Sequence, residues 1–430
     1  MFKSLIKYLL VFLLSVLISV FVVYQFQGQV AQLRLIPHGI IKLIFPEKRV
    51  EPVVGEKTST ENLTSEILNA NSFEVYLDEV EYFAGYSLNK DGSVNEQHMS
   101  AALYGSYQND KRRLELYTRD GFLITKNKTT KFDLPRNYDP HNSQGGIRGV
   151  FFIKENPYAY LASKKIGCQN MSIIDLNTSI EIFETDCLPD YKNIHLGGVG
   201  GASMHHNENI LLSIGAPTNS SQMIRDLAQN QKSFFGKIIS INKESVLNNE
   251  KKAIIKIYSS GHRNPQGIAK IDNYIFSSEH GPKGGDELNF IEENSNYGWP
   301  VASYGTKYES LASASYKLNH KKNSFKEPLL QFTPSIAISD LTNCSNQMMV
   351  YYERKGCLLA TTLRDKSLYI ILLSDDYSRV IGYEKIEFGE RLRHIAKQKN
   401  NKLFQDNDGS IYIASDSGKV IKVYFKLIKG

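Results

Sequence analysis

The sequence predicts an all-β protein that follows one apolar N-terminal segment, and three observations support this. Short runs rich in β-branched and aromatic residues recur along the chain, such as "FEVYLDEV", "GVFFI", "KIISIN" and "SLYIILLS". Gly, Asn, Asp and Ser turns separate these runs, as expected for short strands joined by hairpins. Tyr and Phe are abundant, with 25 and 21 copies, and aromatic side chains favour strands. After the N-terminal segment, only "SSQMIRDLAQNQKS" suggests a helix.

Residues 1–27 predict a membrane anchor. Lys3 and Lys7 precede a segment over residues 8–26 that carries no charged side chain. About 20 apolar residues are enough to cross the hydrocarbon layer as a helix. No small-x-small cleavage site follows, so the pattern favours a retained anchor over a signal peptide. The two lysines predict a cytoplasmic N-terminus in the inner membrane, with the rest of the chain in the periplasm or at the cell exterior.

Residues 28–71 predict a tether, and residues 72–430 predict the folded domain. The stretch "PEKRVEPVVGEKTSTENLTSE" is rich in Glu, Lys, Thr, Ser and Pro and has little apolar surface to bury. The net charge is +6, from 51 basic and 45 acidic residues, and it is spread along the chain. Because no basic block is present to follow a phosphate backbone, we expect no nucleic-acid partner.

Four cysteines form two local pairs in the sequence. Cys168 and Cys187 flank two strand-like stretches, and Cys344 and Cys357 flank "QMMVYYERK". In an oxidising compartment each pair is placed to close the base of a local hairpin. Four separate buried thiols are the alternative. The chain contains no Cys-x-x-Cys motif, so the sequence gives no support to a zinc site or a redox dithiol.

The predicted strands are too many for one small sandwich, which leaves a β-propeller or a pair of sandwiches. A propeller blade needs four strands over roughly 40 to 60 residues, so a propeller of this length would have about six blades. The C-terminal stretch "DGSIYIASDSGKVIKVYF" predicts two paired outer strands of a last blade.

The stretch from Gly261 to Pro300 is the most unusual part of the sequence. It gathers glycines, prolines, a His-Arg-Asn triplet, two adjacent acids and the only Trp of the chain. Its motifs "GHRNPQG", "EHGPKGGDELN" and "NYGWP" resemble, in order and spacing, the signature of the glucose/sorbosone dehydrogenase family of quinoproteins. The resemblance covers most of the chain after about Asn71. It implies a six-bladed β-propeller that uses pyrroloquinoline quinone (PQQ) and calcium.

The resemblance also implies a role for individual residues. Gly281 and Pro282 match positions whose backbone carbonyls bind the calcium of the cofactor, and calcium prefers oxygen ligands. The "HRN" triplet matches cofactor contacts, with Arg263 and Asn264 as hydrogen-bond donors. The other cofactor contacts that the resemblance implies are Gln144, Arg364, Arg391 and Arg393. The residues that match a second, structural calcium site are Glu287, Tyr297 and Tyr308.

His195 matches the catalytic base of the family. A base that titrates near neutral pH suits removal of the hydroxyl proton of a sugar while hydride leaves the same carbon. Calcium would polarise the quinone carbonyl. The match fails at Ala216, where the family has an Asp that pairs with this His, and a base without its carboxylate loses orientation. Asp226, ten residues further on, is a possible substitute. Arg148 stands where an apolar residue is usual.

Three functions follow from these patterns. The first is a membrane-anchored quinoprotein that oxidises aldose sugars or related alcohols and passes electrons to a quinone or a redox protein. The second is a catalytically impaired propeller that binds ligands, which Ala216 favours. The third is a calcium-dependent hydrolase of the lactonase type, which the motifs of the quinone family disfavour.

Overall fold

The computed structural model describes residues 72–140, 145–188, 196–217, 221–248, 253–307, 316 and 319–428, together with the backbone of residues 66–69. The predicted anchor over residues 1–27 and the first part of the predicted tether lie outside these residues. Within the described part, no helix is both long enough and apolar enough to span a bilayer.

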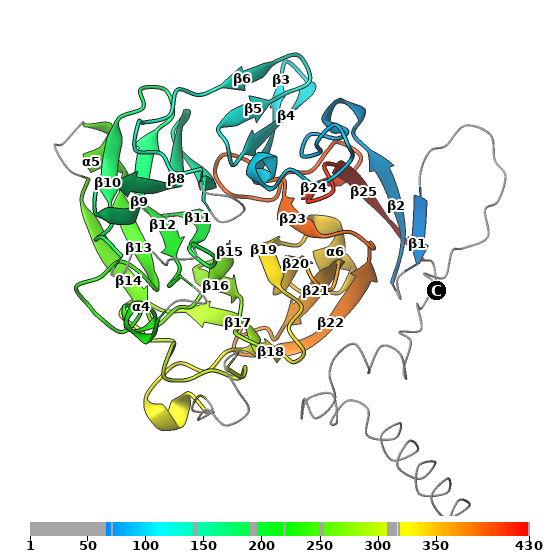
Figure 1. Cartoon of the computed structure of the whole chain (residues 1–430). Coiled ribbons are helices and arrows are strands. Elements are labelled where there is room, and N and C mark those ends of the chain that lie inside the picture. The colour runs from blue at the N-terminus through cyan, green and yellow to red at the C-terminus, as the bar shows by residue number, and fades with distance from the viewer. Residues whose placement is uncertain are drawn as a thin grey trace, which may run out of the picture. The chain divides into compact units, whose positions relative to one another are not determined.

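The described chain forms six antiparallel β-sheets, five of which consist of four strands that are consecutive in sequence (Figure 1). The first of these sheets contains β3 (Ser100–Gln108), β4 (Lys111–Thr118), β5 (Phe122–Ile124) and β6 (Thr129–Lys131). The second contains β7 (Ile147–Ile153), β8 (Asn156–Lys165), β9 (Cys168–Asp175) and β10 (Glu181–Glu184). The third contains β11 (Gly200–His206), β12 (Asn209–Ile214), β13 (Lys237–Asn242) and β14 (Ile255–Ser260). The fourth contains β15 (Pro265–Ile271), β16 (Tyr274–Glu279), β17 (Asp286–Ile291) and β18 (Leu330–Phe332). The fifth contains β19 (Ile338–Asn343), β20 (Cys357–Thr362), β21 (Ser367–Leu373) and β22 (Val380–Glu387).

The sixth sheet joins the two ends of the folded chain. It has the order β1 (Glu66–Asn69), β2 (Phe73–Glu79), β25 (Val420–Leu427), β24 (Ile411–Ser415) and β23 (Leu392–Ile395). Strand β2 pairs with β25 along its whole length. The predicted outer strands at the C-terminus are confirmed as β24 and β25. Strand β1 lies inside the stretch predicted as a tether, so this sheet begins before Ser72.

The six sheets are the blades of a closed ring. The inner strand of each blade, which is β3, β7, β11, β15, β19 or β23, contacts the inner strand of the next blade, and β23 contacts β3. The described part of the chain is therefore a six-bladed β-propeller, and the alternative of two sandwiches is excluded. Inner strands approach closely at the centre. A Cβ atom on Gly149 of β7 would lie 2.0 Å from the carbonyl oxygen of Gly201 in β11, so only glycine fits.

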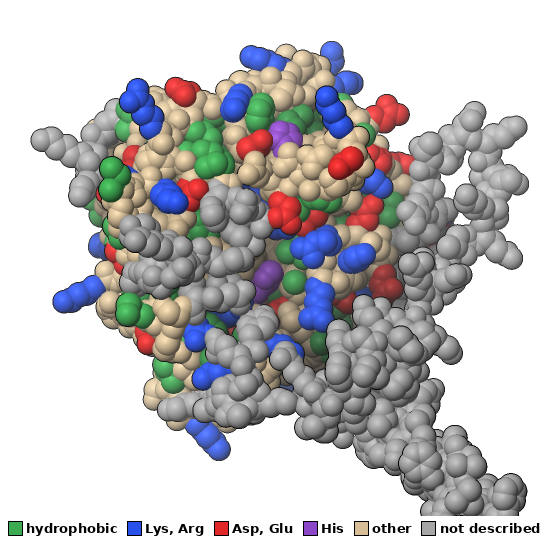
Figure 2. Space-filling model, viewed as in Figure 1, with side chains coloured by type: hydrophobic (Ala, Val, Ile, Leu, Met, Phe, Trp, Pro, Cys, Tyr) green, Lys and Arg blue, Asp and Glu red, His purple; other side chains and the backbone are tan. Residues whose placement is uncertain are grey.

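Apolar layers between neighbouring blades hold the ring together. One such layer joins the β8 and β9 side chains Tyr160 and Ile173 to Leu212 of β12 and Ile239 of β13, and all four are fully buried. Each buried side chain of this size contributes roughly 1.5–3 kcal/mol. Figure 2 shows one face of the molecule, on which Lys and Arg side chains border a central hollow.

Both local cysteine pairs form disulfides, which rules out four separate thiols. The Cys168–Cys187 bond ties the start of β9 to the segment after β10, its partner in the same hairpin. The Cys344–Cys357 bond ties the end of β19 to the start of β20. Disulfides that close loops of this length contribute about 3 kcal/mol in the chain-entropy model.

The second cysteine pair does not enclose a hairpin, contrary to the prediction. Most of "QMMVYYERK" lies in helix α6 (Asn346–Tyr351) or just after it. The Ser345 side chain caps this helix by accepting a hydrogen bond from the backbone N–H of Met348, and Met348 is buried. The serine cap and the burial of Met348 both favour the helix in a stretch that also contains valine and tyrosines. Two other short helices are α4 (Gln222–Asp226), within the predicted helical segment, and α5 (Lys243–Leu247).

Candidate active site

A cavity of about 450 Å³ opens where the inner strands of the propeller begin. Its wall includes residues at or next to the first position of five inner strands, which are Met99, Arg148, Asn264, Ala337 and Arg393. Because the inner strands run in the same direction around the ring, side chains far apart in sequence meet at this end. The volume lies in the usual range for sites that bind small molecules.

Apart from His262, every predicted cofactor residue that the structure describes lines this cavity. They are Arg263, Asn264, Gly281, Pro282, Arg364, Arg391 and Arg393. Gln144, His195 and Tyr308 lie outside the described residues, so their predicted roles stay predictions. Gly198, three positions after His195 in the sequence, also lines the cavity.

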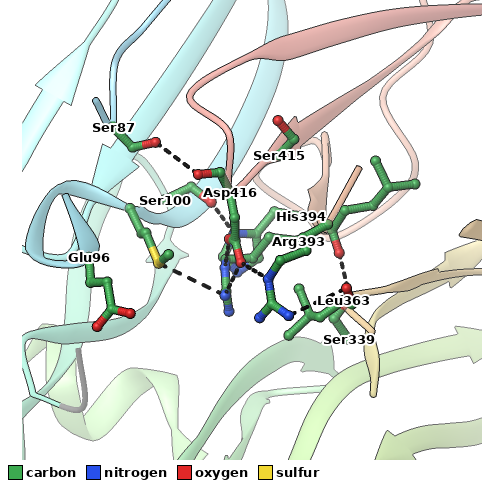
Figure 3. A network of polar contacts seen from close by, with 12 residues as sticks. Ser87, Glu96, Ser100, Ser339, Leu363, Arg393, His394, Ser415 and Asp416 are labelled. Atoms are coloured by element: carbon green, nitrogen blue, oxygen red, sulfur yellow. Dashed lines mark hydrogen bonds and ion pairs between the residues drawn. The ribbon is translucent and has the colours of Figure 1, made fainter. Parts of the chain in front are cut away.

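Arg393 is the most firmly held cation of the cavity. Its guanidinium binds the buried Asp416 carboxylate through two nitrogens, Nε to Oδ1 and Nη2 to Oδ2, and the second distance is 2.7 Å (Figure 3). Arg391 donates to the same carboxylate through Nε at 2.9 Å. Asp416 lies just after β24, and its backbone carbonyl accepts a bond from Ser87. The pair thus fixes the direction of one cation in the cavity wall.

Acid is expected to weaken the fold through Asp416. Burial raises its pKa, but Arg393 and Arg391 outweigh burial and lower the pKa to about 2, below the ordinary 3.8. A depressed carboxyl pKa stabilises the folded state above the unfolded pKa, and this contribution is lost as the pH falls through about 2. We expect a loss of about 2 kcal/mol between pH 4 and 2. Urea unfolding of the wild type and of Asp416→Asn over this range would measure it, and parallel curves would contradict the prediction.

Three guanidiniums share one side of the cavity. Burial lowers the pKa of Arg119 well below its ordinary value, and repulsion from Arg148 and Arg393 lowers it further. Burial and repulsion from Arg393 also lower the pKa of Arg148, to about 10. Arg148 Nε and Nη1 are shielded from solvent and have no hydrogen-bond partner among the described residues. Such crowding of like charge is costly unless an anion occupies the space between the cations.

Gly281 and Pro282 belong to a loop that Asp286 holds in place. Asp286, the first residue of β17, is fully buried, and its Oδ1 accepts a hydrogen bond from the backbone N–H of Gly281 at 2.9 Å. A Cβ atom on Gly281 would lie 2.1 Å from the Gly285 carbonyl, so the loop requires glycine there. Within the described residues, no donor is bonded to the carbonyl oxygen of Gly281 or Pro282. These two oxygens suit a hard cation such as calcium.

Glu287 and Tyr297, predicted for the second calcium site, line one smaller cavity of about 10 Å³, together with Glu279. That volume is close to the space occupied by a single water molecule. Burial raises the pKa of Glu287 well above its ordinary range, and repulsion from Glu279 adds to the effect. The Tyr297 hydroxyl is already engaged, because it donates to the Phe290 carbonyl at 2.6 Å. No cluster of three His, Cys, Asp or Glu suited to a metal occurs in the described ranges.

The histidine of the "HRN" triplet lies outside the larger cavity, unlike the other two residues of the motif. His262 is fully buried, hydrogen-bonds Ser259 at 2.8 Å and stacks on the Tyr297 ring at 4.6 Å between centroids. It does not line the larger cavity, which Arg263 and Asn264 reach from the following positions.

Comparisons with known proteins agree with this architecture. A family model described as Glucose / Sorbosone dehydrogenase matches residues 166–422. The chain belongs to this family. Aldose sugar dehydrogenase YliI of Escherichia coli is 29% identical over 182 residues, which are 40% of this chain and 45% of that protein. Quinoprotein glucose dehydrogenase B of Acinetobacter calcoaceticus is 27% identical over 232 residues, or 44% and 48% of the two chains.

The chain spans about half the length of these curated relatives. A crystal structure of the soluble aldose sugar dehydrogenase of Escherichia coli in the apo-form superposes with a TM-score of 0.61 at 19% identity, covering 82% of this chain and all of that one. At this identity the superposition supports the propeller fold.

Ala216 stands where the sequence resemblance implies an Asp, and the structure shows its surroundings. It is fully buried and packs with Ala228, Trp299 and Tyr316 in a small apolar cluster. Its backbone N–H donates to the Arg263 carbonyl at 2.8 Å.

Asp226 does not replace the missing carboxylate at the cavity. It is exposed at the end of α4, where its carboxylate accepts a hydrogen bond from Gln222 at 2.6 Å. It is also absent from the cavity wall.

The sequence did not predict four of the residues that form this site. Arg119, Arg148 and His280 line the cavity, and Asp416 anchors Arg393 behind its wall. Burial lowers the pKa of His280 to about 4, so its ring is neutral near pH 7. His280 directly precedes Gly281 in the motif "EHGP", and this position could have identified it as a site residue from the sequence. Arg119 and Asp416 end strands of different blades, and only the ring closure brings them together.

Proposed function

We propose that this chain is a quinoprotein sugar dehydrogenase that oxidises aldose sugars or related alcohols with PQQ and calcium. Membership of the glucose/sorbosone dehydrogenase family supports the reaction class. The observation that carries the proposal is the cavity that gathers Arg263, Asn264, Arg364, Arg391 and Arg393 around the Gly281–Pro282 loop.

The residues of this cavity fit the proposed cofactor. PQQ carries three carboxylates and an ortho-quinone, and arginine forks suit planar carboxylate and quinone oxygens. The cavity offers guanidiniums whose mutual repulsion an anion would relieve. The unbonded carbonyl oxygens of Gly281 and Pro282 offer ligands for calcium. When bound, this group would accept a hydride from the sugar, with the metal polarising the accepting carbonyl.

The chain itself would bind the substrate, orient it and move one proton. We assign the role of general base to His195, which would remove the proton of the hydroxyl group on the carbon that loses hydride. The sugar thereby loses two electrons and becomes a lactone. Arg393, fixed by Asp416, and Asn264 would hold the cofactor in the cavity. An external quinone or redox protein would then remove the electrons.

We further propose that residues 1–27 anchor the propeller in the inner membrane and that the propeller faces the periplasm or the exterior. The uncharged segment over residues 8–26 supports the anchor. The two disulfides fit an oxidising compartment, because cytosolic thiols are kept reduced.

A second candidate function is a binding module with the same scaffold but impaired catalysis. The environment of Ala216 favours it, because its apolar cluster supplies no carboxylate to orient a base, and Asp226 is bonded elsewhere. The relatives reported above whose names state an activity are dehydrogenases, so we do not pursue the lactonase alternative.

One experiment separates the two candidates. The full chain is incubated with calcium and PQQ, quinone binding is followed by calorimetry, and dye reduction is measured with a panel of aldoses. For a dehydrogenase we expect turnover that His195→Ala lowers by roughly 10²- to 10⁴-fold, the usual contribution of a general base.

The variant Ala216→Asp tests the missing carboxylate, with its melting temperature as a control for the cost of burying a charge. Quinone binding without turnover in both the wild type and a folded Ala216→Asp would favour the binding module. Full activity in His195→Ala would remove that residue from the mechanism, and failure to bind PQQ would refute the proposed cofactor.

A further inference from the structure

A further cavity, of about 720 Å³, opens where four neighbouring inner strands end. Its wall includes Gln108 at the end of β3, Lys154 just after β7, His205 near the end of β11 and Gln398 just after β23. The inner strands begin at the candidate active site, and the nine residues of β3 span roughly 30 Å, so this far cavity lies at the opposite face of the propeller. Its volume suits a small-molecule ligand.

The charges of the far cavity nearly cancel. Arg113 Nη2 lies 2.8 Å from Glu115 Oε1, and Lys399 Nζ donates to Glu155 Oε2 at 2.6 Å. Lys154 is the remaining Lys, Arg, Asp or Glu of the described wall. Arginines gather in the candidate active site, whereas the far cavity carries little net charge and therefore favours a neutral ligand.

The wall of the far cavity offers both hydrogen-bond donors and hydrogen-bond acceptors. Gln398 and Gln405 each donate through Nε2 to a backbone carbonyl of their own loop, at 3.3 and 3.1 Å, and within the described residues each Oε1 stays available as an acceptor. Asn400 Oδ1 accepts the backbone N–H two residues further on, at 3.1 Å, so its Nδ2 is the available donor. A hydroxyl group both donates and accepts, whereas an anion needs donors alone. These amides therefore suit a ligand with several hydroxyl groups.

Two less exposed groups of the wall also lack full satisfaction. His205 Nε2 is shielded from solvent and has no hydrogen-bond partner in the part of the chain that the structure describes. Burial lowers the pKa of His205, so its ring is neutral near pH 7. The Glu115 side chain is 8% exposed, and its Oε2 has only a long contact of 3.5 Å with the Tyr117 hydroxyl. Buried polar atoms are normally satisfied, so these two point to a ligand or water in the far cavity.

Tyr107 gives the far cavity a fixed aromatic surface. Its side chain is 40% exposed, its hydroxyl donates to Asp406, and its ring lies 5.6 Å from the Phe404 ring between centroids. Both residues whose rings meet here line the cavity. A sugar ring has an apolar C–H face that packs on an aromatic ring while its hydroxyl groups bond to polar neighbours.

We propose that the far cavity binds a short neutral oligosaccharide, with its hydroxyl groups on the Gln398, Gln405 and Asn400 amides and one sugar ring against Tyr107. The inference goes beyond the proposed function, because this binding site is separate from the candidate active site and needs neither PQQ nor calcium. Such a site would hold the protein on a glycan without reacting with it.

Calorimetry on the full chain, without added PQQ or calcium, tests the inference. Maltotriose, cellotriose and chitotriose are the neutral probes, and trigalacturonate is the anionic probe. We expect at least one neutral trisaccharide to bind with a Kd of about 1 mM or lower. Tyr107→Ala should weaken this binding about tenfold or more, whereas Tyr107→Phe keeps the ring and should bind within about threefold of the wild type. Tyr274→Ala removes a tyrosine with the same 40% exposure outside the far cavity and should bind as the wild type does.

Three results would overturn the inference: no binding of any neutral probe, tighter binding of trigalacturonate than of every neutral probe, or a neutral affinity that Tyr107→Ala leaves unchanged. If thermal melting shows that Tyr107→Ala does not fold, the double variant Gln398→Ala and Gln405→Ala takes its place, with the same expected loss. Because PQQ is left out, failure of the proposed function is seen separately, as a lack of dye reduction once PQQ and calcium are added.

Discussion

Replacing Asp286 by alanine is expected to lower the free energy of unfolding by about 3 kcal/mol or more and to abolish the calcium binding that we propose for the Gly281–Pro282 loop. The buried carboxylate accepts hydrogen bonds from the Gly281 and Ala337 backbones and from the Ser335 hydroxyl, at 2.9, 2.6 and 2.7 Å. Hydrogen bonds to a charged group contribute about 1.5–3 kcal/mol each, and the orphaned donors add a desolvation cost. The loop and the segment before β19 would lose their common anchor.

Asp286→Asn is the matched control, because an amide keeps the shape and one acceptor oxygen. We expect it to retain part of the stability and to bind calcium more weakly than the wild type. Urea unfolding measures the first effect, and calorimetry with calcium in the presence of PQQ measures the second. If Asp286→Ala bound calcium as tightly as the wild type, the loop would not depend on this carboxylate.

Replacing Lys237 by methionine is expected to cost about 2–5 kcal/mol of unfolding free energy. Lys237 begins β13 and is fully buried, and its Nζ donates to the carbonyls of Leu227, Ala228 and Phe235 at 2.8–2.9 Å. Its amine nitrogen therefore holds three carbonyls of the segment after α4, although burial lowers the pKa of Lys237 to about 7. Methionine fills the same space but leaves three carbonyls without this donor, and a buried unsatisfied group costs about 1–3 kcal/mol.

Lys256→Met is the control for the loss of a lysine on the same sheet, because Lys256 is exposed on the neighbouring strand β14. Surface substitutions of this kind usually change stability by less than about 0.5 kcal/mol. Denaturant unfolding of the two variants should therefore differ clearly. Equal midpoints would show that the buried amine contributes no more than a surface charge.

The sequence predicted the features that depend on local pattern. Strand texture and chain length suggested six blades, and the three motifs between Gly261 and Pro300 located Arg263, Asn264, Gly281 and Pro282, which do meet in one cavity. The same texture misassigned the stretch that forms α6, where Ser345 caps a helix and Met348 is buried in the tertiary structure. No sequence pattern assigned a role to Asp286, and its burial and its hydrogen bond to Gly281 show that it anchors the loop.

Features that depend on the ring could not be predicted from local pattern. Arg119, Arg148 and Asp416 come from three blades, and each follows or begins a strand without any motif around it. These residues become neighbours only because the inner strands of all six blades surround one central channel. The pairing of β2 with β25 joins residues about 350 positions apart, and a window of sequence contains no information about it.

The pairing of β2 with β25 also sets an order of events for folding. The last blade takes strands from both ends of the domain, so it cannot be completed until Val420–Leu427 has been synthesised and has reached β2. Until then β2 has an unpaired edge, and such edges promote aggregation. Ribosomes add roughly 5–20 residues each second, so this edge stays open for tens of seconds. In a chain truncated before β25, the edge of β2 would stay unpaired, and the incomplete propeller would be exposed to quality-control proteases.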